Sequence, residues 1–485
     1  MLYCHGMAVN VWSATVPLAT ARTALGEVRA AHEVRLDFPD EVVAEAQANI
    51  ARHTLPDRDL TALEFVTLDP ASSTDLDQAF HVEPKGGGYR VRYAIADVPG
   101  FVPIGGALDR ETRRRGETVY CPDVKASLHP PMLADDAASL LPDVVRSAFV
   151  WTIDVADDGQ ATFVSLERAN VHSRAKLAYE QEQRRLDAGE PHPQIVLLRE
   201  VGLRREAQEV ARGAVSLPSA AQEVHESPDG GIALVYRTPQ PIEGWNAQLS
   251  LMTGMAAARI MLDGQVGVLR TMPPPTEADI SKVRASARGL GIAWPDGASY
   301  PEVIRSLDPH DPKHQAFLDN VTILMRGAGY TVFDGMRPEL AEHSAIAGPY
   351  AHVTAPLRRL VDRFGLEVCL ALVEGRPVPD GIRAALPELP ELMSAAVRRD
   401  RSVERECLDY LEAEMLAGRE GVAFRGVVIE QRRDDGIVQL ADPAITAKVR
   451  GRDLPVGEWV DAWLVRADPV ERKVVFDVTP RSKRG

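Results

Sequence analysis

Residues 67–79 of the 485-residue chain read Thr67-Leu-Asp69-Pro-Ala-Ser-Ser-Thr-Asp75-Leu-Asp77-Gln-Ala79. Three carboxylates therefore fall among small and turn-forming residues. A loop of this composition can fold Asp69 back against Asp75 and Asp77, and converging carboxylate oxygens suit Mg²⁺ or Mn²⁺. Without a cation, the neighbouring charges would repel and raise one another's pKa. The stretch therefore predicts a divalent metal site, although an acidic surface turn could have the same composition.

The segments after this loop have the pattern of β-strands. Tyr89, Val91, Tyr93 and Ile95 alternate with other residues and so share one face of a strand. The glycines at 86–88 mark a turn between two strands. Further strands are expected over 148–155 and 161–171, followed by a helix over 175–187 and by a mostly helical region over 245–372. These elements predict a large α+β domain of mixed sheet and helices over residues 63–388, preceded by a short helical region over 1–62.

The pattern of apolar and turn-forming residues changes over about the last hundred residues. Apolar residues at helical steps predict a connecting helix over 389–417. Gly and Pro then punctuate five short strands in the remaining segment, 418–485, as expected for a five-stranded OB-type β-barrel. Six cations lie on the first three strands and their loops, where they could hold a nucleic acid strand or form an ordinary mixed surface: Arg425, Arg432, Arg433, Lys448, Arg450 and Arg452.

Charge and composition exclude several classes of protein. The chain has 55 Lys and Arg against 70 Asp and Glu, a net charge of -15. This balance argues against a protein that coats nucleic acid through a general basic surface. No stretch reaches the roughly 18–20 apolar residues that span a bilayer, and no secretory leader is evident. Cys4, Cys121, Cys369 and Cys407 show no CxxC spacing. We therefore expect a cytoplasmic protein without a membrane partner.

The acidic stretch also carries a resemblance. Asp69, Asp75, Asp77 and Ala79 resemble the acidic signature of the ribonuclease II / ribonuclease R (RNB) exoribonuclease family. The resemblance continues in order along the chain, from about residue 64 to 365, through islands at 94–98, 105–120, 131–142, 173–181 and 350–359 with Asp362. It implies metal-dependent, processive hydrolysis of single-stranded RNA from a free 3′ end to 5′-mononucleotides. It also implies a monomer and an RNA-binding C-terminal OB domain.

The resemblance implies roles for particular residues. Asp69 would be a metal ligand, Asp75 a ligand or orienting residue, and Asp77 the residue most critical for chemistry. Arg358 would contact the scissile phosphate with Arg359 beside it, unless both arginines are surface residues paired to Asp362. Tyr120 would stack on bases near the 3′ end, and Tyr179 would help to distinguish ribose from deoxyribose. For each tyrosine the alternative is a place in the core.

The chain also departs from the family pattern. Gln78 replaces a usual metal-binding aspartate, and Gln248, within Asn246-Ala-Gln-Leu-Ser250, replaces a glutamate near the substrate sugar. A glutamine carbonyl can still bind a hard cation, but it brings no charge. The region before the catalytic domain is too short for the family's two cold-shock domains, so we expect a short form with a shortened RNA entry path.

Two hypotheses follow. The first is an active exoribonuclease that uses Mg²⁺ or Mn²⁺, with Gln78 as a neutral ligand. The second is an RNB-like RNA-binding protein that has lost turnover because of Gln78. A phosphatase or other hydrolase that uses the Asp75–Asp77 pair is a weaker third interpretation.

Overall fold

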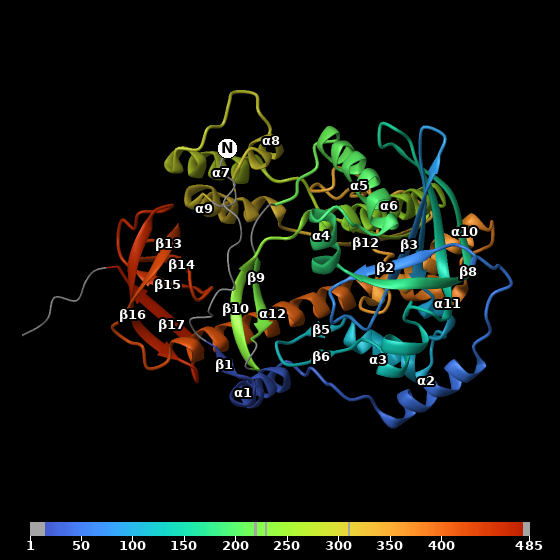
Figure 1. Ribbon diagram of the computed structural model, residues 1–485, viewed down its shortest axis with the longest axis horizontal. Helices are drawn as coiled ribbons and strands as arrows, with labels where there is room; N and C mark the ends of the chain where they lie inside the picture. The colour runs from blue at the N-terminus through green and yellow to red at the C-terminus, as the bar shows by residue number, and fades with distance from the viewer. Residues whose placement is uncertain (1–14, 218–220, 228–229, 309–310, 479–485) are drawn as a thin grey trace, which may run out of the picture.

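A computed structural model describes residues 15–217, 221–227, 230–308 and 311–478. Within this part of the chain two closed β-barrels lie toward opposite ends of an elongated molecule (Figure 1). The fold is therefore α+β with a five-stranded barrel at the C-terminal end, as the sequence predicts.

The larger barrel carries the acidic stretch. Its strands follow the order β2-β3-β4-β7-β8 and comprise β2 (Phe65–Asp69), β3 (Gln78–Lys85), β4 (Gly88–Ala96), β7 (Val145–Val155) and β8 (Ala161–Ala178). The expected alternation on β4 is confirmed, because Val91, Tyr93 and Ile95 all lie in the main hydrophobic core. The expected glycine turn joins β3 to β4.

The predicted helix over 175–187 is wrong at its start. β8 continues to Ala178, and α4 spans only Tyr179–Asp187. The reason is tertiary, because residues 175–178 pair in parallel with residues 66–69 of β2. Ladder hydrogen bonds and burial override the weak helical preference of this alanine-containing segment. The longer strand brings Tyr179 beside the end of β2.

Helices and short elements pack around this barrel. The helices are α3 (Ala107–Arg115), α5 (Pro193–Ala211), α6 (Pro241–Asp263), α10 (Leu360–Val373) and α11 (Asp380–Ala385). Two small antiparallel pairs join them: β5 (Val119–Tyr120) with β6 (Lys125–Ala126), and β11 (Val266–Thr271) with β12 (Gly329–Asp334). Three short helical turns lie here: η1 (Val98–Gly100), η2 (Leu133–Ala137) and η4 (Leu386–Glu388). A fourth, η3 (Thr322–Met325), belongs instead to the core that includes Val427 and Ile429.

The N-terminal residues do not form a separate core. β1 (Val16–Pro17) extends the hairpin of β9 (Ala221–Glu226) and β10 (Gly231–Arg237), and α1 (Leu18–Ala31) packs on α12. In contrast, α2 (Asp40–Arg52) packs beside the larger barrel through Val42 and Ala46. Two of the expected helices are therefore present among residues 15–62, but they join different cores; residues 1–14 of the predicted region lie outside the described residues.

The C-terminal barrel has the predicted five strands, in the order β13-β14-β15-β17-β16. They are β13 (Ala423–Gln431), β14 (Asp435–Leu440), β15 (Thr446–Arg450), β16 (Trp459–Asp468) and β17 (Lys473–Asp477). Helices α7 (Glu277–Leu290), α8 (Tyr300–Arg305) and α9 (Pro312–Val321) form a core with β13 through Val427 and Ile429. A segment within the predicted catalytic domain therefore packs against this barrel.

The basic cluster of the small barrel is mostly paired. Arg425, Arg432, Lys448 and Arg452 form ion pairs with carboxylates of the same barrel. Arg425 also lies over the ring of Trp459, which is 45% exposed. The surface is therefore closer to a mixed one than to a strip of unpaired cations, although Trp459 offers a stacking surface.

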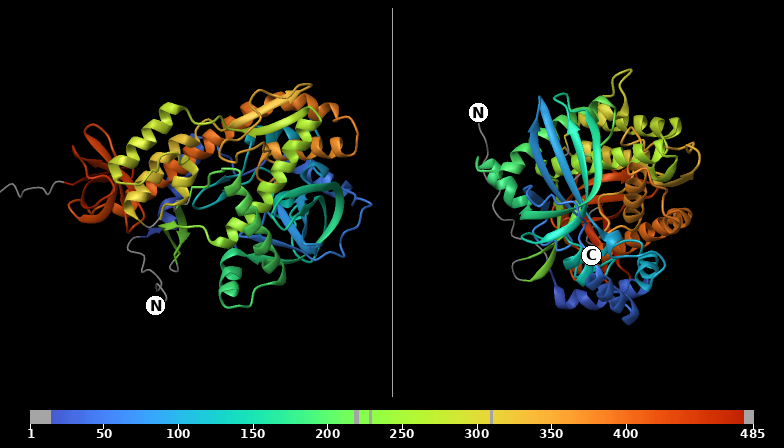
Figure 2. Two further views of the ribbon diagram at one scale, coloured as in Figure 1. Left: turned by 90° about the horizontal axis from the view of Figure 1, so that it is seen from above. Right: turned by 90° about the vertical axis from the view of Figure 1, so that its right-hand side faces the viewer.

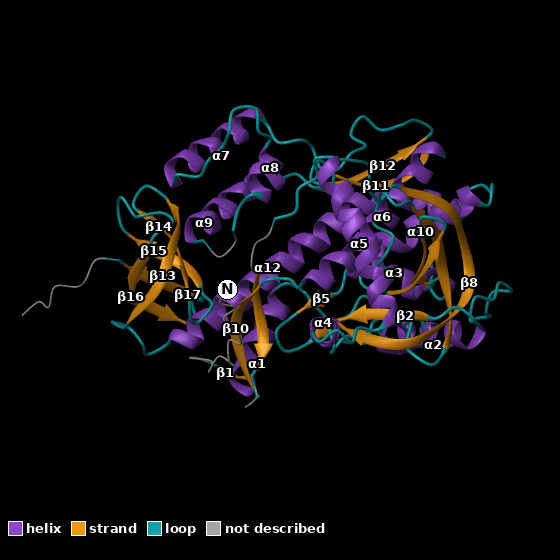
Figure 3. Cartoon of the chain, turned by 45° about the horizontal axis from the view of Figure 1, so that its top comes forward, coloured by secondary structure: helices purple, strands orange, loops and turns teal. Residues whose placement is uncertain are grey.

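Helix α12 (Leu389–Leu416) connects the two ends of the molecule, as the apolar spacing predicts (Figures 2 and 3). It contacts β12 near the larger barrel, α1 in the middle, and β16 and β17 of the small barrel. We find among the described residues no helix with the length and apolar character needed to cross a bilayer.

A buried carboxylate on α12 predicts a pH-dependent stability. Glu412 accepts hydrogen bonds from the Gln222 side chain (2.8 Å) and the Thr446 backbone N–H (3.1 Å), both through Oε1. Burial raises its pKa from 4.5 to about 7. The folded protein therefore holds a proton that the unfolded chain releases above pH 4.5. The free energy of unfolding should fall between about pH 4.5 and 7, by about 3 kcal/mol from this group.

We expect Glu412→Gln to remove this dependence, because the amide keeps Oε1 as an acceptor and needs no proton. Urea denaturation should give similar stabilities for the variant and the wild type at pH 4.5, and a more stable variant at pH 8. An equal difference at both pH values would contradict the assignment.

Candidate active site

The acidic loop lies between the end of β2 and the start of β3. Lys176 on β8 shapes it, because its Nζ donates hydrogen bonds to the carbonyls of Ala71 (2.8 Å) and Ser73 (2.5 Å). The loop opens on a cavity of about 1220 Å³. All nine residues that the sequence singled out line this cavity: Asp69, Asp75, Asp77, Gln78, Tyr120, Tyr179, Gln248, Arg358 and Arg359.

Asp69 lies at the end of β2, where it pairs in register with Ala178 of β8. Its Oδ2 is buried and has no hydrogen-bond partner among the described residues. Burial raises the pKa of Asp69 to about 6; Asp75 adds to the shift, and Arg358 and Lys176 oppose it. A buried carboxylate oxygen without a partner is costly, so this atom is suited to receive a cation.

Asp77 is 3% exposed and is held by residues 354–359, which precede α10 and are called the arginine loop below. Its Oδ1 accepts a hydrogen bond from the Leu357 N–H at 2.7 Å, and its Oδ2 lies 3.5 Å from Arg358 Nε. Burial raises the pKa of Asp77, whereas the Arg358 guanidinium and the Leu357 N–H oppose the shift. Asp77 thus joins the acidic loop to the arginine across the cavity.

Asp75 is held by the β5–β6 hairpin. Lys125 Nζ lies 3.0 Å from Asp75 Oδ1, and the Tyr120 hydroxyl donates to Asp75 Oδ2 at 3.3 Å. Lys125 also pairs with Asp135 at 2.7 Å. The sequence reasoning did not single out Lys125, because nothing in its local pattern shows that the hairpin folds over the acidic loop. The same hairpin places Tyr120 at the cavity with 53% of its surface exposed.

The two adjacent arginines differ in their surroundings. Arg359 donates from Nε and Nη2 to the carboxylate of Asp362, each at 2.9 Å. Asp362 is fully buried and also accepts from the Ala355 N–H at 2.7 Å. Arg358 instead extends beside Asp77, with 47% of its side chain exposed. The pairing that the sequence left open for both arginines is therefore found for Arg359, and Arg358 remains accessible to a ligand.

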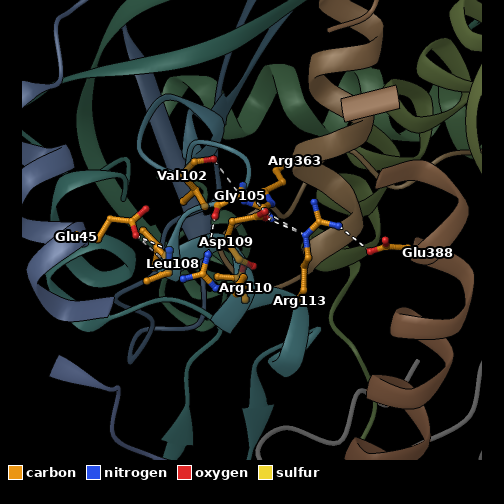
Figure 4. Close-up of polar contacts among 11 residues, drawn as sticks. Glu45, Val102, Gly105, Leu108, Asp109, Arg110, Arg113, Arg363 and Glu388 are labelled. Carbon is orange, nitrogen blue, oxygen red and sulfur yellow. Dashed lines mark hydrogen bonds and ion pairs between the residues drawn. The ribbon is translucent and has the colours of Figure 1, made fainter. Parts of the chain in front are cut away.

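The arginine loop is anchored on both sides. The Thr118 N–H donates to the Arg358 carbonyl at 2.9 Å, and the Leu360 N–H donates to the Gly116 carbonyl at 2.9 Å. Behind the loop, Asp109 of α3 pairs with Arg363 of α10 and with Arg113 (Figure 4). Asp109 and Arg363 are both almost fully buried. This network fixes the start of α10 and hence the position of Arg358 relative to Tyr120.

The opposite wall is formed by α6. Asn246 Nδ2 donates to the Tyr179 hydroxyl at 2.7 Å and to the Leu68 carbonyl at 3.3 Å. Gln248 donates to Glu209 of α5 at 2.5 Å, whereas its own Oε1 is buried without a partner among the described residues. Asn246 and Glu209 were missed from the sequence. Asn246 begins the stretch 246–250 quoted from the sequence but received no role there, and no local signal identifies Glu209.

Gln78 is tied to the arginine loop rather than to the aspartates. Its amide nitrogen donates to the Thr354 carbonyl. An aspartate has no N–H with which to make this contact. Gln78 therefore cross-links β3 to the arginine loop, and its carbonyl oxygen is the atom left to face a cation.

The donor chemistry of the cavity fits a divalent cation. Asp69 and Asp77 supply buried oxygens with raised pKa, and a cation would favour their charged forms. The ligand set is not preassembled, because among the described residues no three His, Cys, Asp or Glu side chains already form a cage. Asp75 lines the same cavity, and its carboxylate is already paired with Lys125 and bonded to Tyr120. Asp69 and Asp77 therefore have the oxygens best suited to hold the ion, and the ligand roles expected for Asp75 and Gln78 stay predictions.

Two barrels joined by a long helix, with this cavity at the larger one, define an RNase R-like fold. The chain matches the RNB domain over residues 57–365 and the RNase II-type exonuclease C-terminal S1 domain over residues 423–479. It belongs to the RNB family.

Comparison with known proteins agrees with this assignment. The chain is 27% identical over 430 residues to Ribonuclease R of Escherichia coli, covering 82% of this chain and 52% of that protein. It thus spans about half the length of this relative. Mycoplasma genitalium RNase R in complex with ribose-methylated single-stranded RNA superposes with a TM-score of 0.85 at 18% identity, over 95% of this chain and 78% of that one. Yeast Ssd1, a pseudonuclease, shares the fold at 15% identity with a TM-score of 0.65, over 90% and 58%.

Proposed function

We propose that the protein is a metal-dependent exoribonuclease that hydrolyses single-stranded RNA processively from a free 3′ end and releases 5′-mononucleotides. The observation that carries the proposal is the meeting of Asp69, Asp77 and Arg358 in one cavity with two tyrosines. Family membership supports it, as do the names of the relatives. The protein would act as a monomer in the cytoplasm.

Each side chain has a role that its surroundings allow. Arg358, whose guanidinium is accessible, would donate to the oxygens of the scissile phosphate, where negative charge grows in the transition state. Asp77 would accept a hydrogen bond from the attacking water and orient it, because its position is fixed by the Leu357 N–H. Mg²⁺ or Mn²⁺ held by Asp69 and Asp77 would lower the pKa of water and offset charge on the phosphate.

The tyrosines would hold the end of the strand. Burial raises the pKa of Tyr179, so that its hydroxyl stays protonated and can donate to a ribose oxygen while it accepts from Asn246. Tyr120 offers an exposed ring at the cavity. Gln248 is held by Glu209 and Arg359 by Asp362, so both would help to shape the wall of the cavity. Gln248 Oε1 remains available as a hydrogen-bond acceptor for the RNA.

Substitution of Tyr120 separates stacking from its contact with Asp75. Tyr120→Ala should weaken binding of a short single-stranded RNA by roughly 5- to 150-fold, because stacking of one base contributes about 1–3 kcal/mol. Tyr120→Phe keeps the ring and should bind within about twofold of the wild type. Fluorescence anisotropy with labelled RNA in EDTA measures both. Equal weakening by the two variants would show that the hydroxyl, not the ring, holds the RNA.

The proposed reaction is tested by its products. Uniformly labelled single-stranded RNA incubated with the protein and Mg²⁺ or Mn²⁺ should give 5′-mononucleotides, and EDTA should stop their release. RNA that is bound but remains intact with either metal would favour the non-catalytic RNA-binding alternative. Internal fragments without mononucleotides would indicate an endonuclease instead.

A further inference from the structure

A second hollow, of about 410 Å³, lies outside the cavity described above. It is lined by residues of the β7–β8 hairpin, of the C-terminal end of α5 and of α6. One wall is apolar and is formed by Phe163, Met252, Met255 and Ile260. Its volume is in the range of pockets that hold small molecules.

The polar side of this hollow holds two arginines without carboxylate partners at ion-pair distance among the described residues. Arg205 is 5% exposed and donates from Nη1 to the Gly159 carbonyl at 2.7 Å, but its Nε is buried without a partner. Arg212 donates from Nε to the Ile346 carbonyl at 2.8 Å, and its Nη2 is likewise unpartnered. Both guanidinium groups are thus fixed by backbone carbonyls, and each keeps a buried N–H group without an acceptor.

The charges around the arginines favour an anion. Burial, together with the neighbouring Arg212, lowers the pKa of Arg205 to about 10. Glu209 is the carboxylate that acts on both arginines, and it is already bonded to Gln248 and Ser216. At the rim, Asp263 is paired with Arg259 at 2.9 Å. A phosphate would supply hydrogen-bond acceptors for both guanidinium groups and would offset the repulsion between their positive charges.

The turn between β7 and β8 packs on α5 beside this hollow. Gly159 has a φ of +85°, and a Cβ there would lie 2.4 Å from the Arg204 carbonyl of α5. Gln208 donates to the Asp158 carbonyl at 2.7 Å, a second link between the turn and the helix. The turn therefore lies directly on α5 and holds Arg205 in place.

The hollow also adjoins the catalytic cavity, because Arg212 lines both. We propose that it binds a nucleoside 5′-monophosphate, with the phosphate on Arg205 and Arg212 and the base against the methionine and phenylalanine wall. The identity of the ligand rests on the proposed function, because the proposed product is a nucleoside 5′-monophosphate and would be released in the adjoining catalytic cavity. Thioether and aromatic groups are suitable partners for the face of a base.

Photo-crosslinking in EDTA and without RNA tests the site independently of turnover. The probe, 8-azidoadenosine 5′-monophosphate, should label peptides that contain Phe163, Met252 or Met255. AMP should compete at least tenfold better than adenosine or inorganic phosphate alone. Labelling confined to peptides of the catalytic cavity, such as the one containing Tyr179, would overturn the proposal. Competition by phosphate as good as that by AMP would also overturn it, by showing a site for a simple anion.

Two variants sharpen the test. Arg205→Met should weaken AMP binding at least tenfold, whereas Arg199→Met, an exposed arginine on the same helix, should leave it within about twofold. Ala256→Trp, which fills the hollow from α6 and keeps both arginines, should also abolish labelling. Unchanged labelling in a folded Ala256→Trp variant would overturn the proposal. An inactive protein that still binds AMP here would contradict only the nuclease function, and an active one without labelling only this site.

Discussion

Asp77→Asn should lower RNA hydrolysis by roughly 10³-fold or more, the scale on which loss of an essential catalytic group lowers kcat. Asparagine is nearly isosteric and can still accept the Leu357 N–H through Oδ1, so the arginine loop should keep its position. It lacks the charge that would hold a cation and orient water. Single-turnover assays with excess enzyme measure the chemical step directly.

Two controls belong with this variant. Its affinity for single-stranded RNA in EDTA should remain within about threefold of the wild type. Its thermal midpoint should not fall, because the substitution replaces a buried carboxyl group, whose pKa is raised by burial, with a neutral amide. Equal, negligible release of mononucleotides by wild type and variant, while both bind RNA, would show that this chain lacks turnover.

Arg358→Ala should be the second most damaging substitution, with roughly 10²-fold slower hydrolysis, because one preorganised donor to the transition-state charge is lost. Its side chain is 47% exposed and approaches Asp77 only at 3.5 Å, so the loss should be larger in kcat than in stability. Arg358→Lys keeps the positive charge but loses the planar fork, and it should recover only part of the rate.

The neighbouring arginine provides the contrast. Arg359→Ala should lower the thermal stability, because it leaves the fully buried Asp362 without its ion pair. If Arg358→Ala lowered stability and left the rate unchanged, the roles of the two arginines would be exchanged.

Much of the fold could be predicted from local patterns. The alternation at Tyr89–Ile95 and the spaced turns after Gly418 are short-range signals, and both barrels contain the expected strands. The end of β8 could not be predicted in this way, because residues 175–178 become a strand only through parallel pairing with β2. Long-range pairing leaves no trace in the local sequence.

The site divides along the same line. The acidic loop was predicted from its own residues and Arg358 from the family resemblance, and the structure brings them to one cavity. Lys125, Asn246 and Glu209 were missed, since each acts through a partner distant in sequence.

The net charge of -15 excludes less than the sequence analysis suggested. It argues against a broad basic surface, but not against a cavity with a few fixed cations and aromatic rings.

Hydrolysis from a free 3′ end can be measured with an RNA labelled on its 3′-terminal nucleotide. This RNA is incubated with the protein and Mn²⁺, beside the same RNA with a 3′-terminal phosphate. We expect immediate release of labelled 5′-mononucleotide from the free 3′ end, and much slower release from the blocked one. Bound RNA that keeps its 3′ label for many hours with Mn²⁺ or Mg²⁺ would contradict this expectation.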